Sequence, residues 1–292
     1  MTKGFQAADN CADAIHIDLW RIVRQRIGRY GYLLPHWPVI PLERLICQRQ
    51  MNELLGKASG LAGSAFCGKV LAELGIKLAV SGSDRLPASG RCLFVCNHPL
   101  GGLDGIALMA WLAAVYGREP KVLVNDLLTA VTPLAGNFVP VNKFGRLSRS
   151  SSIDFDKVLA GDDPVLVFPA GLVSRMDSNG YVSDLKWRKT FVTKALQSRR
   201  DVVPLFFDAM NSLRFYKFCR LRVKLGIKGN LEQSLLPSEL FRQNGNTFRL
   251  VCGQTLPWAT LANGNPDKEA QKIREIVYAL ASRTSQAKLI HI

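Results

Sequence analysis

The sequence predicts an α/β fold: a mainly parallel sheet flanked by helices, with a helical unit at the N-terminus. Short apolar runs typical of buried strands recur from about residue 76 onward, and helical segments separate most of them. This alternation is the pattern of βαβ units, whose strands run parallel. Before residue 76 the patterns are helical, over 13–34 and 42–58, with a proline-marked break between them. We therefore expect a helical appendage over 1–75 and an α/β domain over 76–292.

The expected strands share a short length and an apolar character. They are 77–82, 91–97, 121–125, 137–142, 164–171 and 202–207, with further candidates at 222–226 and 247–253. The helical segments that separate or follow them are 105–117, 150–160, 187–198 and 266–283. The last helix opens on Asn265, Pro266 and Asp267, which are favourable residues for a helix start.

Composition limits the classes of function. The chain has 292 residues, of which 48% are hydrophobic, so it can bury a large core and is not disordered as a whole. Its 38 Lys and Arg against 23 Asp and Glu give a net charge of +15. Such a surplus attracts nucleic acid, an acidic carrier protein or an anionic membrane. No nucleic-acid-binding motif is recognisable, so we expect no nucleic-acid partner.

The cysteines and the apolar runs bear on the compartment. Seven scattered cysteines, with no regular spacing, are typical of reduced thiols in the cytosol. We expect no secretory signal, because the first residues lack an apolar core. The longest apolar run, 106–116, is shorter than the roughly 20 residues that cross a bilayer. We therefore expect a soluble or peripheral protein.

The segment 13–34 is a candidate for contact with a membrane. Aromatic side chains lie close to arginines in and just beyond it, as suits the interface of an anionic bilayer; they are Trp20, Tyr30, Tyr32 and Trp37, beside Arg21, Arg24, Arg26 and Arg29. The alternative is an ordinary amphipathic helix that packs on its own domain. The sequence leaves both open.

The stretch FVCNHPLGGLDG, residues 94–105, has the features of a catalytic turn. His98 follows a buried strand, and loops at the carboxyl ends of parallel strands are where α/β proteins place their chemistry. A neutral imidazole there can accept a proton from a hydroxyl, and Asp104 can hold its tautomer and stabilise the imidazolium. The alternative makes His98 a polar loop residue and Asp104 a cap of the next helix. The two roles of Asp104 are compatible.

Four motifs in order resemble those of the glycerolipid acyltransferases, which include the lysophosphatidic acid acyltransferases. They are Asn97-His98 with Asp104, PVNK at 140–143, VFPAGLVSR at 167–175 and VVPLFFD at 202–208. A bacterial, haemolysin-like branch, some of whose members make amino-acid-containing lipids, is more similar still. That similarity also includes LKWRKTFVTKAL at 185–196 and DAMNSLRFY at 208–216, and the whole resemblance covers about 76–260.

The resemblance implies transfer of a fatty acyl chain from a thioester, acyl carrier protein or acyl-CoA, to the hydroxyl of a lyso-lipid. His98 is then the general base and Asp104 its partner, with the acyl donor as co-substrate and no other cofactor. The enzyme would be peripheral, on the cytoplasmic face of the membrane. Residues expected to bind substrate, the basic ones for an anionic head group, are Lys143, Arg146, Arg149, Phe168, Pro169, Gly171 and Arg175.

Two departures from the family pattern concern the substrate and the turn. Five residues separate His98 from Asp104 where the family has four, and Gly101-Gly102 can absorb the additional one. Ala170 stands where the family has a glutamate that helps to hold the acceptor. The absence of this glutamate is compatible with an acceptor other than a glycerol-phosphate lyso-lipid. Asp208 is a distant candidate to replace the carboxylate.

Other interpretations remain beside this one. Cys96 next to His98 would suit a thioester intermediate, although a cysteine in such an apolar run is more typical of a core. The segment 63–70 imitates a phosphate-binding loop but lacks its Ser/Thr and its preceding strand. No His/Cys cluster has metal-ligand spacing, so we expect no metal. The rival function is a non-catalytic basic protein that binds nucleic acid or membrane; a thioesterase or lipase is a third, without a GxSxG elbow to support it.

Overall fold

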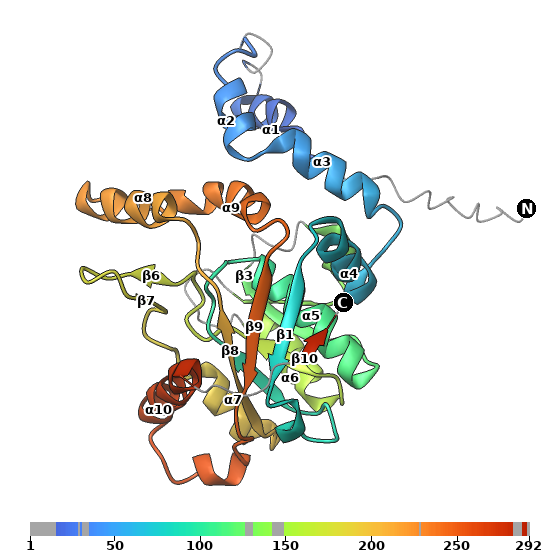
Figure 1. Ribbon diagram of the computed structural model, residues 1–292, viewed down its shortest axis with the longest axis vertical. Coiled ribbons are helices and arrows are strands. Elements are labelled where there is room, and N and C mark those ends of the chain that lie inside the picture. The colour runs from blue at the N-terminus through green and yellow to red at the C-terminus, as the bar shows by residue number, and fades with distance from the viewer. Residues whose placement is uncertain are drawn as a thin grey trace, which may run out of the picture.

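An eight-stranded sheet, in the order β10-β1-β9-β8-β2-β5-β3-β4, organises the computed structural model (Figure 1). The structure describes residues 16–28, 30, 35–125, 131–141, 149–227, 229–282 and 288–290. The strands of this sheet are β1 (Lys77–Ser81), β2 (Leu93–Cys96), β3 (Lys121–Asn125), β4 (Phe138–Val141), β5 (Val165–Val167), β8 (Val202–Asp208), β9 (Thr247–Cys252) and β10 (Lys288–Ile290). Among the strands of this sheet, as far as the structure describes them, the β1–β10 and β8–β9 pairings are antiparallel and the others parallel, so the predicted mainly parallel sheet is confirmed.

Helices cover both faces of the sheet. The α-helices of the described residues are α1 (Leu19–Ile27), α2 (Ile40–Leu45), α3 (Gln48–Lys57), α4 (Gly63–Glu73), α5 (Leu103–Tyr116), α6 (Arg149–Ala160), α7 (Thr190–Ser198), α8 (Leu213–Lys224), α9 (Leu236–Arg242) and α10 (Pro266–Ala279). One apolar cluster joins α4 and α5 to the sheet, and a second joins α6, α7 and α10 to its other face. The sheet is therefore the middle layer of three.

Strand β2 shows why these strands are apolar throughout. All four of its residues are buried. Phe94 and Cys96 belong to the cluster under α5, whereas Leu93 and Val95 belong to the cluster on the opposite face. Because successive side chains of a strand point to opposite faces, a strand covered on both sides has no polar face. At its carboxyl end this strand carries the turn with His98 and Asp104, which the sequence predicts to be a catalytic turn.

Helices α1–α3 project past the sheet at the end of the molecule where α8 and α9 lie (Figure 1). Asp18 caps α1 by accepting a hydrogen bond from the backbone N–H of Arg21. Asn52 of α3 exchanges two hydrogen bonds with the backbone of Ile17, which ties the start of α1 to α3. Tyr32 and Arg29, part of the expected membrane contact, lie outside the described residues. No helix in the described part of the chain combines the length and hydrophobicity that spanning a bilayer requires.

The prediction of a strand at 222–226 is wrong, because this segment contains the end of helix α8 and the two residues after it. Alternating basic and apolar residues from Arg222 to Leu225 imitate a strand. The residues before them decide the structure: Ser212 caps the helix with its side chain, and Phe215, Tyr216 and Cys219 are buried at helical spacing.

The segment 63–70 is helical from Gly63 onward and forms most of α4. Lys69, which would hold a phosphate in a phosphate-binding loop, lies 2.6 Å from Glu73 one helical turn later. Phe66 and Val70 are buried in the core beside α5. The rejection of this motif is therefore confirmed.

Candidate active site

Asn97 fixes the chain where β2 ends and the catalytic turn begins. Its side-chain amide donates to the carbonyl of Phe207 at 2.9 Å, and its amide oxygen accepts from the N–H of the same residue at 2.7 Å. The side chain thus continues the hydrogen bonding between β2 and β8 for one more step. His98, the next residue, is held at the carboxyl edge of the sheet.

Asp104 lies at the centre of the turn and is 0% exposed. Its Oδ2 is 3.0 Å from Nδ1 of His98. The carboxylate also accepts hydrogen bonds from backbone N–H groups of the turn, at 2.9 to 3.4 Å; the donors are Leu100, Gly101, Gly102 and Gly105. The turn wraps around one carboxylate, and this wrapping accommodates the additional residue between His98 and Asp104.

The charges of the pair shift both pKa values in the direction that a general base needs. Burial alone would lower the pKa of His98, but the charge and hydrogen bond of Asp104, together with the charge of Asp184, raise it above its ordinary value. Burial would raise the pKa of Asp104, yet His98 and the backbone donors lower it. Asp104 therefore stays ionised and stabilises the imidazolium.

The other nitrogen of His98 is available to a substrate. Nδ1 is engaged by Asp104, and Nε2 has no hydrogen-bond partner among the described residues. The side chain is 15% exposed, and its ring stacks on Phe168 at 4.1 Å between centroids. Phe168, predicted from the third motif, thus lies against the flat face of the imidazole and limits its rotation.

The segment Phe168 to Gly171 forms a tight turn directly after β5. The N–H of Gly171 donates to the carbonyl of Phe168 at 2.9 Å, and Gly171 has a φ of +67°, which favours glycine. Ala170 is only 4% exposed and packs in the core on the side of α7. The family's glutamate position is therefore filled here by a buried methyl group.

Among the remaining predicted residues, the side chain of Arg175 is engaged by a carboxylate other than that of Asp104. Arg175 lies 2.6 Å from Glu232, a buried carboxylate that also pairs with Arg222 at 2.7 Å. Lys143 and Arg146 lie outside the described residues, and Arg149 begins α6. Asp208, the candidate to replace the missing glutamate, lies at the carboxyl end of β8 and pairs with Arg249 of β9 at 2.8 Å.

Sequence reasoning missed Asp184, a second buried carboxylate. Its Oδ1 accepts from the backbone N–H of His98 at 3.1 Å and from the hydroxyl of Ser174 at 2.6 Å. Its Oδ2 accepts from the indole N–H of Trp187 at 2.9 Å. The N–H of Ser174 in turn donates to the carbonyl of His98 at 2.9 Å. The peptide groups on both sides of His98 are thus held by the segment around the hairpin of β6 (Arg175–Met176) and β7 (Val182–Ser183).

Comparison with known proteins shows the family of the chain. The profile of a family described as acyltransferase matches residues 21–285. The chain belongs to this acyltransferase family. It is 37% identical to the lyso-glycine lipid O-acyltransferase of Phocaeicola vulgatus, over 90% of this chain and 95% of that protein. It is 38% identical to the protein of the same name from Bacteroides thetaiotaomicron, over 90% and 97% of the two chains.

One solved structure is similar to this acyltransferase in outline: the crystal structure of the 1-acyl-sn-glycerophosphate acyltransferase of Thermotoga maritima. The two share 14% sequence identity at a TM-score of 0.48, over 91% of this chain and 97% of the other.

Cys96 of the acyltransferase is a core residue, as its apolar surroundings predicted. It is 0% exposed, and burial, followed by the charges of Asp104 and Asp184, raises the pKa of its thiol well above the ordinary value. A protonated, buried thiol is a poor nucleophile. The described residues also contain no group of three His, Cys, Asp or Glu side chains able to hold a metal ion.

The acyltransferase should lose both stability and activity when Gly101 is replaced by alanine. Gly101 has a φ of +77°, and an added Cβ would overlap Val173 and press against Leu236. Left-handed strain and overpacking together cost about 1–3 kcal/mol. Gly102→Ala is the matched control, because Gly102 has no neighbour within 4 Å of such a Cβ. Chemical unfolding and acyl transfer measured on both variants check this, and equal losses in the two would contradict it.

Asp184→Ala should lower kcat about ten- to a hundredfold and leave KM for the acceptor nearly unchanged. The variant removes the acceptor of the His98 backbone N–H, so the imidazole shifts from its position. The rate of the chemical step falls steeply when a reacting group is misplaced. Trp187→Phe removes one donor to Asp184 and keeps the other two, so its effect should be several-fold at most. If folded Asp184→Ala kept its kcat and lost only thermal stability, Asp184 would have no positioning role.

Proposed function

We propose that this enzyme transfers a fatty acyl chain from a thioester to the hydroxyl of a lyso-glycine lipid. The observation that carries the proposal is the His98–Asp104 pair in a chain 37–38% identical, over nearly its whole length, to two lyso-glycine lipid O-acyltransferases. Membership of the acyltransferase family favours this reading over a non-catalytic basic protein. The proposed donor is acyl carrier protein or acyl-CoA.

The proposed reaction is a direct transfer with no acyl-enzyme. Nε2 of His98 accepts the proton as the acceptor's hydroxyl oxygen attacks the thioester carbon, and a C–O bond forms. Collapse of the tetrahedral intermediate breaks the C–S bond, and the imidazolium returns the proton to the departing thiolate. Asp104 stays ionised and stabilises the imidazolium between these two steps.

The Phe168–Gly171 turn supports an acceptor other than a glycerol phosphate. A glutamate at position 170 would place a negative charge beside the site, whereas Ala170 adds none and is buried. A glycine head group presents a carboxylate, for which we propose Lys143, Arg146 and Arg149 as the binding cations. Arg175 is bound to Glu232, so we assign it a structural contribution to this region before a direct one.

The proposal extends to the organisation of the chain. We propose that residues 1–75 are a helical appendage, whose last helix, α4, packs on the sheet, and that 76–292 are the catalytic unit. The appendage would hold the enzyme on the cytoplasmic face of an anionic membrane as a peripheral protein. Support comes from the exposed side chains of Ile22 and Ile27, which lie on α1 among its arginines, and from the exposed side chain of Trp37.

The test is acyl transfer by the purified enzyme with labelled acyl carrier protein and acyl-CoA as donors. The acceptors compared are lyso-glycine lipid, lysophosphatidic acid and the lyso-lipid of a different amino acid. A diacylated glycine product formed at least about tenfold faster than the others is expected. Preference for lysophosphatidic acid would contradict the proposed acceptor, and absence of product with every acceptor and donor would contradict the proposed reaction.

A further inference from the structure

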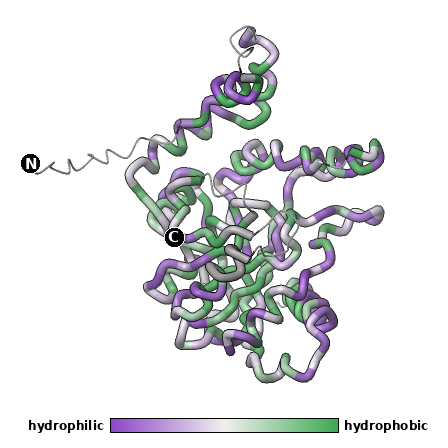
Figure 2. Tube along the Cα trace, turned by 180° about the vertical axis from the view of Figure 1, so that it is seen from behind, coloured by the Kyte–Doolittle hydropathy of each residue, from purple (hydrophilic) through white to green (hydrophobic). Residues whose placement is uncertain are grey.

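The exposed half of α8 carries an apolar stripe. Phe218, Leu221 and Leu225 follow one another at spacings of three and four residues, so they lie along one side of the helix and its final turn. Their exposed fractions are 38%, 53% and 63%. Figure 2 shows the alternation of hydrophobic and hydrophilic residues along this helix at the rim of the molecule. This stripe does not pack against the core, because Phe215 and Cys219 form the buried side of α8.

A stripe of cations lies beside the apolar one. Lys217, Arg220 and Lys224 repeat at the same spacing and are exposed. Helix α8 contains no acidic residue, and the next one along the chain, Glu232, is buried and paired with arginines. We call these six side chains, three apolar and three basic, the α8 face. An anionic partner meets no exposed carboxylate within this helix.

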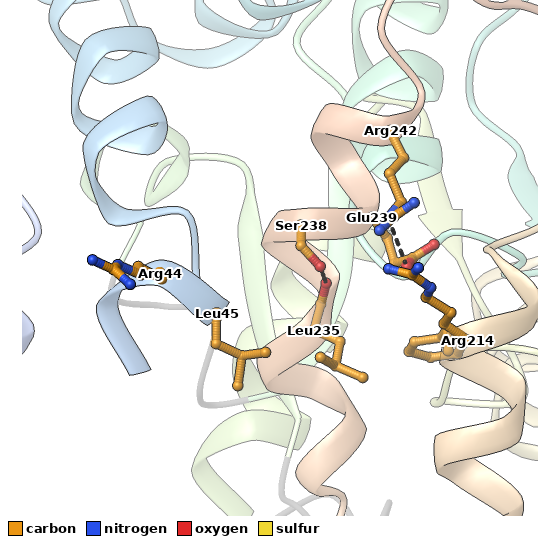
Figure 3. Close-up of a pocket in the computed structure, with 8 residues that line it drawn as sticks. Arg44, Leu45, Arg214, Leu235, Ser238, Glu239 and Arg242 are labelled. Carbon is orange, nitrogen blue, oxygen red and sulfur yellow. Dashed lines mark hydrogen bonds and ion pairs between the residues drawn. The ribbon is translucent and has the colours of Figure 1, made fainter. Parts of the chain in front are cut away.

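A pocket of about 260 Å³ at the start of α8 extends the cationic character. It lies between α2, α8 and α9 (Figure 3). Arg214 of α8 and Arg242 of α9 reach toward Glu239 in it, and Nε of Arg242 is 3.6 Å from that carboxylate. Three arginines, Arg44, Arg214 and Arg242, line this pocket together with one carboxylate, that of Glu239, so the lining has excess positive charge where the α8 face begins.

Helix α8 begins beside the turn of His98, at the same edge of the sheet. The side-chain amide of Asn211, just before α8, donates to the carbonyl of Pro99 at 3.0 Å, one residue from His98. Leu236 at the start of α9 lies against Gly101. A surface that holds α8 at a membrane therefore also holds the catalytic turn close to that membrane.

We propose that the α8 face is a docking surface for an anionic lipid bilayer, with the apolar stripe entering the interface and the lysines contacting head groups. This rests on the proposed function, in which the acceptor is a lipid. Three exposed apolar side chains in line gain from leaving water, and lysines near an anionic surface add attraction. An acidic carrier protein would use the cations but leave the apolar stripe exposed, so the stripe favours the bilayer.

The test is co-sedimentation of the full chain with vesicles of phosphatidylcholine alone or with about one third phosphatidylglycerol. Leu221→Glu/Leu225→Glu should reduce binding to the anionic vesicles at least about tenfold. Lys217→Gln/Lys224→Gln should reduce it about fivefold for each lysine and weaken its dependence on salt. Val115→Glu is the matched control: it makes the same kind of exchange on an exposed residue at the far end of α5 and should bind like wild type.

Acyl transfer to an acceptor in detergent micelles separates docking from catalysis. The Leu221→Glu/Leu225→Glu variant should keep wild-type transfer there, because no bilayer has to be approached. Undiminished vesicle binding by this variant would overturn the proposal, as would an equal loss in Val115→Glu. The proposal would also be overturned if the Leu221→Glu/Leu225→Glu variant bound vesicles normally but no longer bound acyl carrier protein. If the wild-type protein shows no acyl transfer in micelles, that result contradicts the proposed reaction and not the docking surface, since vesicle binding is measured without substrate.

Discussion

His98→Ala should reduce kcat for acyl transfer about a thousandfold in a protein that stays folded. The general base contributes roughly 10²–10⁴-fold in such reactions, and no other described side chain occupies the place of Nε2. Binding of the acceptor should change little, because the proposed head-group cations are elsewhere in the chain. The measurement is single-turnover transfer from labelled thioester, with the melting temperature as the record of folding.

Cys96→Ala is the matched control for the loss of His98. Both residues lie at the carboxyl end of β2, two positions apart, but the buried thiol takes no part in the proposed reaction. We expect Cys96→Ala to lower stability by about 1 kcal/mol through lost packing and to keep activity within a few-fold. Loss of activity in Cys96→Ala, or more than about a tenth of wild-type activity in folded His98→Ala, would contradict a histidine general base without an acyl-enzyme.

Asp104→Asn should reduce kcat by a similar factor and also move the pH profile. An amide keeps the size of the carboxylate but loses its charge and turns an N–H₂ group toward groups that donate hydrogen bonds. The variant removes the charge and the hydrogen bond of Asp104 that raise the pKa of His98, whereas the burial that lowers this pKa remains. The pKa of His98 should therefore fall. The neutral imidazole then persists to lower pH.

The direction of that movement distinguishes this pair from a purely structural one. In the wild type, kcat/KM should rise with pH through a pKa above the ordinary value for histidine. In Asp104→Asn the residual activity should rise at a lower pH. The comparison of the two profiles over pH 5 to 9, in one buffer series of constant ionic strength, checks this. An acid limb that stays in place while the rate falls would show that Asp104 only shapes the turn.

The strands around β2 could be predicted because their apolar runs are continuous. A strand covered by helices on both faces has no polar alternation, and segments such as 121–125 and 202–207 therefore stand out in sequence. Helix α8 could not be recognised in the same way. Basic and apolar residues alternate near its end as they do in a half-buried strand, and its packing on Val173 shows which side is buried.

Within the site, the pair closest in sequence was predictable and the long-range partners were not. His98 and Asp104 share one turn, so their spacing alone indicates that they meet. Asp184 is 86 positions from His98, and its contact is with a backbone N–H, which any residue has. The residue type at position 98 therefore gives no indication that Asp184 is its partner. The role of Ala170 was likewise hidden, because a missing carboxylate does not show whether the position is buried.

The contacts of the catalytic turn with the rest of the chain have a consequence for folding. Asn97 bonds to a residue 110 positions later, Pro99 accepts from one 112 positions later, and Asp184 reaches back over 86. Contacts of such sequence separation form slowly, because a long loop of chain must close before they contribute. The turn therefore takes its final shape only after β8 and the β6–β7 hairpin have docked, late in the assembly of the domain. During synthesis, we expect the turn to reach this shape only when at least about seven tenths of the sequence, through Asn211, has emerged.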